Sequence, residues 1–208
     1  MTLPPNQKFR RITAFHARYT FSAMPAIICM LRGVNVGGHN IIKMDALRAL
    51  CESLKLKSSR TFLQSGNVVF LSNESNLLSL SQRIQDAIER NFGFRPDVVL
   101  RSSSEMRHVI ARNPFASRHG IDPAKLLVTF LATEPAKQAR EALAKFDTRG
   151  EELHFHGNEL YIYFRKGMGQ SKLSWPALEK ALNSSFTGRN WNSVTKMLEI
   201  AEHLEGNL

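Results

Sequence analysis

Apolar residues follow strand-like and helix-like patterns in turn along the chain, starting just after Met24. The run from Ala26 to Leu31 is continuously apolar, which is typical of a buried central strand. Shorter apolar runs at 61–63, 68–71 and 98–100 predict three more strands. Between the strands, apolar residues recur at every third or fourth position, which predicts two helices. Their buried faces are Met44, Leu47, Cys51 and Leu54, then Leu77, Leu80, Ile84, Ile88 and Phe92. This order is ferredoxin-like.

The same order begins again in the second part of the chain. The run 126–131 predicts a strand, and residues 152–155 and 160–164 predict a hairpin across Gly157-Asn158. Thr133 is expected to cap the helix between them, and Ser174 to cap the next helix. Any fourth strand is expected to be very short. A final helix would bury Val194, Met197, Leu198 and Ala201.

We therefore predict an α+β protein with two ferredoxin-like subdomains, antiparallel sheets and a C-terminal helix. The expected boundaries are 24–111 for the first subdomain, 112–124 for a connecting loop, and 125–208 for the second subdomain with the helix. In the first subdomain, Ser102 and Glu105 predict a capped short helix through Ile110. Residues 1–23 lack sustained periodicity and contain no acid, so we expect a disordered extension, with an organelle transit peptide as the alternative.

Three polar stretches interrupt this apolar pattern: Arg32–Asn40, Gln64–Asn67 and Arg189–Asn192. The first contains three glycines and precedes a predicted helix near Lys43, so its backbone N–H groups and that lysine could hold an anion. The second lies at a predicted hairpin turn, and the third precedes the last helix. We expect the three stretches to converge on one site, which would then span both halves of the chain.

Each stretch also has a purely structural interpretation. The glycine spacing matches neither the dinucleotide-binding fingerprint nor the Walker loop, and asparagine side chains can hold such turns by themselves. Gly66 with Asn67 suits an ordinary hairpin turn. Trp191 could stack on a base or fill the core. The stretch Gly167–Lys172 is a weaker candidate for an anion-binding loop.

No catalytic constellation is recognisable in the sequence. Glu152, His154 and His156 alternate and would share one strand face, but no fourth metal ligand accompanies them. We therefore expect neither a metal ion nor a cofactor.

The charge and the cysteines narrow the expected environment. The formal net charge is +10, and residues 1–23 contribute Lys8, Arg10, Arg11 and Arg18 to it. A basic surface attracts nucleic acid or phosphorylated small molecules, although net charge identifies no site. Cys29 and Cys51 lack metal-ligand spacing and fit a reducing cytoplasm. No apolar run is long enough to predict a membrane-spanning helix, so we expect no membrane partner.

Several of these motifs, in this order, resemble a known family. They are Leu31–Gly38 with Lys43 and Met44, Phe62–Phe70, Arg101-Ser102, Asn113-Pro114-Phe115, Ser171-Lys172-Leu173 and Thr187–Asn192. Together they resemble the domain-of-unknown-function family 1697 over about residues 24 to 201. The resemblance implies an α+β fold with ferredoxin-like halves and a domain that starts near Met24. It implies no reaction.

From these features we expect a cytoplasmic binding module for an anionic ligand. Nucleic acid is the first candidate, because ferredoxin-like sheets can bind it. The alternatives are an enzyme acting on a nucleotide-like or phosphorylated small molecule, and a protein-interaction module. The sequence leaves the oligomeric state open. The candidate ligand-binding residues are Arg32, Asn35, Gly37, Gly38, Lys43, Gln64, Ser65, Asn67, Lys172, Arg189, Asn190 and Asn192.

Overall fold

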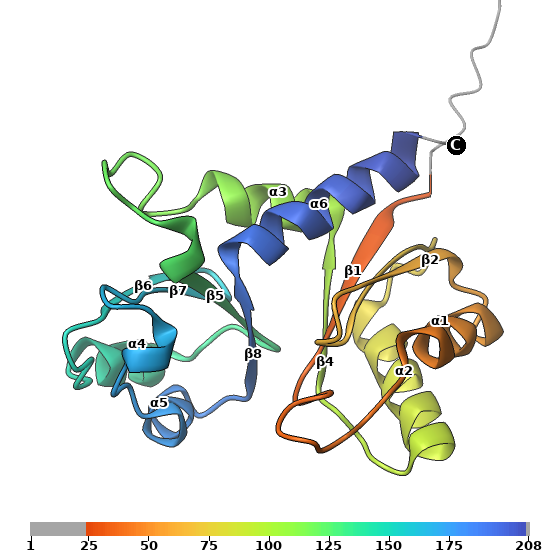
Figure 1. Ribbon diagram of the computed structural model, residues 1–208, viewed down its shortest axis with the longest axis horizontal. Helices are drawn as coiled ribbons and strands as arrows, with labels where there is room; N and C mark the ends of the chain where they lie inside the picture. The colour runs from red at the N-terminus through yellow and green to blue at the C-terminus, as the bar shows by residue number, and fades with distance from the viewer. Residues whose placement is uncertain (1–23, 207–208) are drawn as a thin grey trace, which may run out of the picture.

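The structure, a computed structural model that describes residues 24–206, consists of two halves with the same order of elements (Figure 1). The first half contains β1 (Ala26–Leu31), α1 (Met44–Ser53), β2 (Lys57–Phe62), β3 (Asn67–Leu71), α2 (Leu77–Phe92), β4 (Val98–Ser102) and α3 (Ser103–Ala111). The second contains β5 (Leu126–Leu131), α4 (Lys137–Ala144), β6 (Glu152–His156), β7 (Glu159–Tyr163), α5 (Trp175–Leu182), β8 (Phe186–Asn190) and α6 (Trp191–Gly206). Two short 3-10 turns, η1 (Pro123–Lys125) and η2 (Met168–Gln170), lie in the second half. The predicted α+β fold with two ferredoxin-like subdomains is confirmed. The prediction for residues 1–23 lies outside the described residues.

Each half forms a four-stranded antiparallel sheet, and the two sheets share one topology. Their strand orders are β2-β3-β1-β4 and β6-β7-β5-β8. The registers also agree: Leu31 pairs with the first residue of β4, and Leu131 pairs with the first residue of β8. The β1–β3 register also repeats in the β5–β7 pair, so each residue of β3 and β4 has an equivalent in β7 and β8.

The hydrophobic core has three parts, and one of them belongs to both halves. One face of the first sheet packs on α1 and α2, and one face of the second sheet packs with residues of α4 and α5. The other two faces pack with α3 and α6 in a single cluster that includes Ile28, Val128 and Met197. Figure 1 shows α6 passing over both halves beside α3. Neither sheet therefore leaves an apolar face exposed.

Local details differ from the sequence-based expectations in the second half. Thr133 does not cap a helix, because α4 begins only at Lys137 and the capping position is occupied by Ala136. Proline at 135 disfavours helical geometry in the residue before it, which explains the late start. The fourth strand is not very short: β8 has five residues, as many as β4. Its polar sequence concealed it, since Thr187 to Asn190 do not alternate with apolar residues.

The two predicted serine caps are present. Ser102 accepts the Glu105 backbone N–H, and the Glu105 carboxylate accepts the Ser102 N–H, so α3 begins with a full capping box. Ser174 accepts the Ala177 N–H at the start of α5. None of the helices in the described residues is both long and apolar enough to cross a membrane.

Candidate functional site

Asn35 fixes the loop between β1 and α1 to the hairpin between β2 and β3. Its side-chain amide donates to the carbonyl oxygens of Ile42 (2.9 Å) and Gln64 (2.7 Å), and its Oδ1 accepts the Ile42 N–H (2.9 Å). Its backbone has a φ of +56°, a left-handed conformation that asparagine tolerates better than most residues. The first and second polar stretches are therefore one structural unit.

Gly66 allows that hairpin to lie directly against the end of β1. The Leu31 N–H donates to the Gly66 carbonyl oxygen (2.9 Å). A Cβ atom on Gly66 would lie 2.9 Å from the Cβ of Leu31 and 3.2 Å from the Cβ of Val34, and its φ is +71°. Only glycine satisfies both conditions without displacing the loop.

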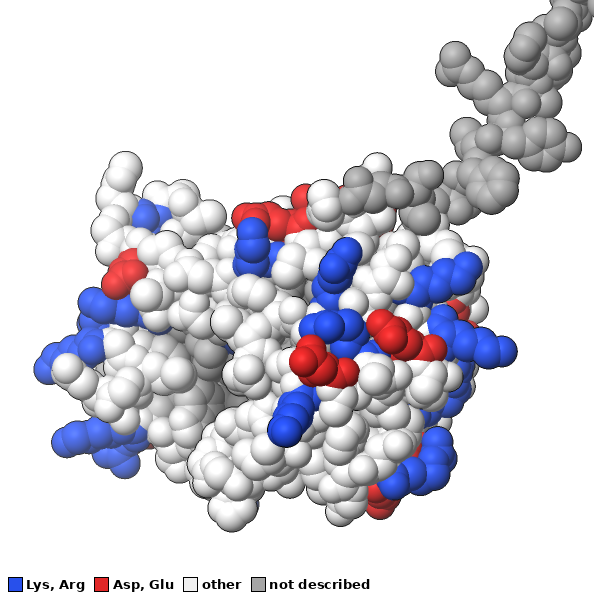
Figure 2. All heavy atoms as spheres, turned by 45° about the vertical axis from the view of Figure 1, so that its right-hand side comes forward, with Lys and Arg blue, Asp and Glu red and all other residues white. Residues whose placement is uncertain are grey.

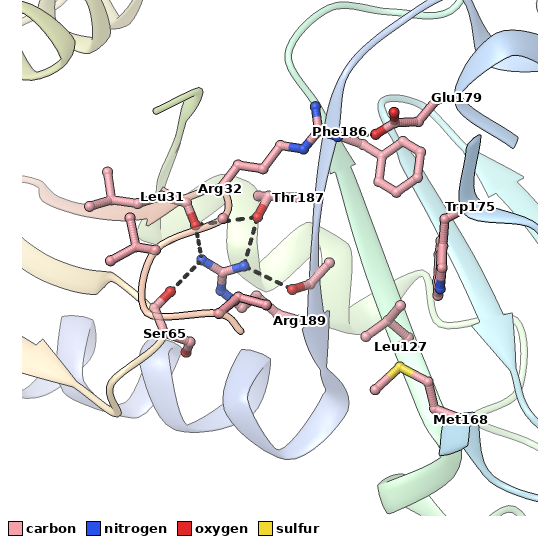
Figure 3. Close-up of a pocket in the computed structure, with 14 residues that line it drawn as sticks. Leu31, Arg32, Ser65, Leu127, Met168, Trp175, Glu179, Phe186, Thr187 and Arg189 are labelled. Atoms are coloured by element: carbon pink, nitrogen blue, oxygen red, sulfur yellow. Dashed lines mark hydrogen bonds and ion pairs between the residues drawn. The ribbon is translucent and has the colours of Figure 1, made fainter. Parts of the chain in front are cut away.

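Arg189 brings the third stretch to the same place from the other half of the molecule. It lies in β8, and its guanidinium group crosses to the first half (Figure 3). Nη2 donates to the carbonyl oxygens of Leu31 (2.7 Å) and Ser65 (3.2 Å), and Nε donates to the side-chain oxygen of Asn67. Nη1 donates to the Thr187 hydroxyl (2.7 Å) and to the Gly188 carbonyl oxygen (2.8 Å). All five N–H groups of the guanidinium are thus used.

The charge of Arg189 has no negative partner among the described residues. The guanidinium donates to three backbone carbonyl oxygens, one hydroxyl oxygen and one side-chain amide oxygen, all of them neutral. Arg189 forms no ion pair with any described carboxylate. Burial lowers the pKa of Arg189 to about 10, so the group is still protonated at neutral pH. A buried cation without a counter-ion is costly and creates a positive potential around itself.

A pocket of about 410 Å³ lies beside Arg189, between the two halves. The first half contributes Leu31, Arg32, Gly33, Val34, Val36 and Ser65, and the second half contributes Leu127, Met168, Trp175, Glu179, Phe186, Thr187, Gly188 and Arg189. One wall is apolar and partly aromatic, because Leu127, Met168 and Trp175 face the pocket there (Figure 3). The opposite wall carries the polar groups of Ser65 and Arg189.

An ion pair spans the two halves at this pocket. Arg32 Nη2 lies against the Glu179 carboxylate, and Arg32 Nη1 lies 3.2 Å from Asp97. All three side chains are partly exposed, so the pair is screened by solvent and contributes little to stability. It places one further cation and one carboxylate within reach of a bound molecule.

The structure brings the three polar stretches together but gives their residues different roles. Arg32, Ser65 and Arg189 line the pocket. Asn35, Asn67 and Asn190 lie in the framework: Asn67 is fully buried, and Asn190 donates to the Ala124 carbonyl oxygen and accepts the Asn192 N–H. The remaining candidates are exposed and do not line the pocket; they are Gly37, Gly38, Lys43, Gln64, Lys172 and Asn192.

Sequence reasoning missed the apolar wall of the pocket. Leu127 and Phe186 read as ordinary core residues, and nothing in the sequence distinguishes Trp175 from a packing residue. Of these wall residues, Met168 alone lies in a candidate stretch, the weaker anion-binding candidate Gly167–Lys172. A residue that lines a pocket between two halves has the same local pattern as one that fills a core.

At the candidate metal site on β6, Glu152 is already paired with two arginines. The Glu152 carboxylate accepts hydrogen bonds from Arg118 and Arg165, which lowers its pKa. Among the residues that the structure describes, no group of three or more His, Cys, Asp or Glu side chains could hold a metal ion.

Comparisons with known proteins give a family and a fold. A family model described as "Protein of unknown function (DUF1697)" matches residues 24–161. Among solved structures, a conserved bacterial protein, SP0830 from Streptococcus pneumoniae, is similar with a TM-score of 0.64 and 23% sequence identity. The match covers 86% of this chain and 99% of that one, and at this identity it shows the fold alone. A search of curated proteins found no match.

Proposed function

Since the chain belongs to the DUF1697 family of proteins of unknown function, we propose a function from the pocket alone: it binds a small organic anion between its two halves. The observation that carries this proposal is the position of Arg189, whose buried charge lies beside the pocket without a carboxylate partner. A negatively charged ligand would offset that charge.

The size and the walls of the pocket support this class of ligand. A volume of about 410 Å³ is in the range of small-molecule sites, which is roughly 300–1,000 Å³. The apolar wall with Trp175 and Phe186 suits a flat ring, and the opposite wall suits a negative group. A nucleotide-like or phosphorylated aromatic molecule combines both features.

Binding fits the lining better than catalysis does. The pocket residues include one carboxylate, Glu179, and it is already paired with Arg32. The Thr187 hydroxyl accepts a hydrogen bond from Arg189. No residue that lines the pocket is therefore available as a general base, which is the role a proton-transfer mechanism requires.

A nucleic-acid polymer fits less well than a free small molecule. The sheet faces that would bind nucleic acid by analogy with other ferredoxin-like proteins are packed in the core. On the face drawn in Figure 2, basic side chains are interspersed with acidic ones. No continuous basic surface is visible on that face.

We keep a cytoplasmic location as part of the proposal. Its support is that Cys29 and Cys51 are both buried as free thiols, which is typical of proteins from a reducing compartment.

The test uses the full 208-residue chain and a panel of nucleoside monophosphates, aromatic phosphates and aromatic carboxylates. The chain has two tryptophans, so Trp191→Phe leaves Trp175 in the pocket wall as the fluorescent reporter. We expect members of the panel to raise the melting temperature and to change Trp175 fluorescence with a saturable dependence on concentration. If no compound changes either signal, the proposal is wrong.

A matched pair of surface variants locates the site. Met168 and Leu78 are both exposed, but only Met168 lines the pocket. Met168→Ala should weaken binding about threefold or more, because it removes apolar contact area. Leu78→Ala should leave the affinity unchanged. Equal effects of the two variants would place the binding site elsewhere.

A further inference from the structure

Arg189 has an equivalent in the first half of the molecule. Arg101 lies opposite Ile28 in the β1–β4 pair, and Arg189 lies opposite Val128 in the β5–β8 pair. Each arginine is 7% exposed and lies one residue before the end of its strand. The repeated topology therefore places two buried arginines at corresponding points between the halves.

The two guanidinium groups make the same backbone contact with the opposite half. Nη2 of Arg189 donates to the carbonyl oxygen of Leu31, the last residue of β1 (2.7 Å). Nη2 of Arg101 donates to the carbonyl oxygen of Leu131, the last residue of β5 (3.0 Å). Each arginine thus ties its own strand to the central strand of the other sheet.

The two arginines differ in the side chain that accepts from Nε. For Arg101 the acceptor is the carboxylate of Glu159 (3.0 Å), the first residue of β7. For Arg189 it is the amide oxygen of Asn67, the first residue of β3. At equivalent positions, one arginine has a counter-ion and the other has a neutral amide.

We infer that Asn67 determines the charge specificity of the pocket. Because Asn67 offers Arg189 a neutral acceptor where Glu159 offers Arg101 a carboxylate, the positive charge remains to be offset by the phosphate or carboxylate of a bound ligand. This inference rests on the proposed function, and it adds that the site selects its ligand by an oxyanion. Asn67 acts through Arg189 and does not touch the ligand, so it is a positioning residue.

The existing hydrogen bonds define how this selection works. All five N–H groups of Arg189 already have acceptors, so the ligand's oxyanion is attracted by charge and not by a dedicated donor pair. Phosphate and carboxylate are then both accepted, and the neutral analogue of the same molecule binds more weakly. The pocket distinguishes charge more strongly than the shape of the anionic group.

The first test compares adenosine 5′-monophosphate with adenosine in the Trp191→Phe protein. We expect the monophosphate to bind about tenfold more tightly or better, because its negative phosphate is attracted to the Arg189 charge through a partly buried medium. Asn67→Asp should remove most of that preference and leave the affinity for adenosine unchanged. A purely structural defect would lower the affinity for both ligands by the same factor. Glu159→Gln, at the equivalent position, should keep the preference.

A second variant guards against a folding defect. The Asn67 side-chain amide also donates to the Phe62 carbonyl oxygen and the Ser65 hydroxyl, and an aspartate carboxylate cannot donate to either. Ser65→Asp keeps Asn67 and brings a carboxylate to the pocket wall beside Arg189. It should lower the preference for the monophosphate in the same way. An unchanged preference in either folded variant overturns the inference.

Collisional quenching of Trp175 tests the charge without any ligand. In the Trp191→Phe protein, iodide should quench Trp175 more strongly than caesium, and Asn67→Asp or Ser65→Asp should lower the iodide-to-caesium ratio. If no panel compound binds but this ratio behaves as expected, the proposed function fails, and with it the ligand selection, while the effect of Asn67 on the charge beside the pocket stands. If compounds bind while the ratio does not respond to these variants, the inference fails and the proposed function stands.

Discussion

Gly66 is the residue at which the β2–β3 hairpin touches β1. A Cβ at this position would lie 2.9 Å from the Leu31 Cβ, and the backbone has a positive φ. We expect Gly66→Ala to lower the free energy of unfolding by about 2–4 kcal/mol, from strain and overpacking together. The measurement is urea unfolding followed by circular dichroism.

Gly38 is the matched control for this prediction. Its φ is +80°, but no atom lies within 4 Å of the position that its Cβ would occupy. Gly38→Ala should therefore cost only about 1–2 kcal/mol, the cost of a left-handed backbone alone. Equal losses in the two variants would contradict the packing argument.

The buried thiols make the free energy of unfolding depend on pH in the alkaline range. Burial raises the pKa of Cys29 far above its usual range and that of Cys51 to about 12. In the unfolded chain both thiols ionise near pH 8.5. Above that pH the unfolded state binds fewer protons than the folded state, so stability falls as pH rises.

We expect that fall to reach about 1.4 kcal/mol per thiol per pH unit between about pH 9 and 10. A Cys29→Ala, Cys51→Ala double variant should lose this slope, whatever its stability at pH 7. Chemical denaturation at several pH values measures it. A slope that persists in the double variant would assign the effect to other groups.

Arg189 shows how far sequence reasoning reaches at a single residue. Its polar surroundings in the sequence marked it as a site residue, and it does line the pocket. The sequence could not show that most of its hydrogen bonds go to Leu31, Ser65 and Asn67, which lie more than a hundred positions away. Hydrogen bonds over such separations have no local pattern.

Glu205 anchors the C-terminal end of α6 to the first half. Its carboxylate accepts hydrogen bonds from the Ala26 N–H (2.9 Å), the Ser103 hydroxyl and Arg107 (3.1 Å). Burial of the carboxyl would raise its pKa, but these hydrogen bonds outweigh burial and lower the pKa below its usual value. The contribution of Glu205 to stability is therefore present above pH ~4.5 and is lost as pH falls through the folded-state pKa.

Glu205→Gln should lower the free energy of unfolding by about 1 kcal/mol at pH 7, since it removes the charge opposite Arg107. The difference from the wild type should shrink toward zero near pH 3, where the wild-type carboxyl is itself protonated. Urea unfolding at both pH values checks this. A difference that stays constant with pH would contradict the role of the charge.

Strands with polar sequences were the elements that sequence patterns located least well. The central strands β1 and β5 are buried on both faces, so their continuous apolar runs identified them. Strand β2 begins at Lys57, four residues before the run that predicted it, and lies at a sheet edge. Strand β8 also lies at an edge and includes Thr187, Gly188 and Arg189. An edge strand needs fewer apolar residues, so its sequence lacks the apolar pattern of a strand. Only its backbone pairing with a neighbouring strand identifies it.

The two halves share one hydrophobic cluster, and this determines how the whole molecule unfolds. The cluster joins faces of both sheets through α3 and α6. Neither half could keep this face buried alone. We expect a single cooperative transition, with the calorimetric enthalpy equal to the van 't Hoff enthalpy in differential scanning calorimetry. Two separable transitions would show that the halves fold independently.

The sequence by itself determined the order of the elements, the central strands, the serine caps and the apolar faces of most helices. These features depend on residues close together in the chain, so periodicity and capping residues reveal them. It also identified the three polar stretches. Only the tertiary structure decided that α3 and α6 cover the inner sheet faces and that a pocket lies between the halves.

The tertiary structure also decided which side chains accept hydrogen bonds from the two buried arginines. Asn67 and Glu159 became comparable only when the repeated sheet registers placed them at equivalent positions. Whether a buried arginine has a counter-ion depends on residues distant in the chain and close in space. No local pattern in the sequence carries that information.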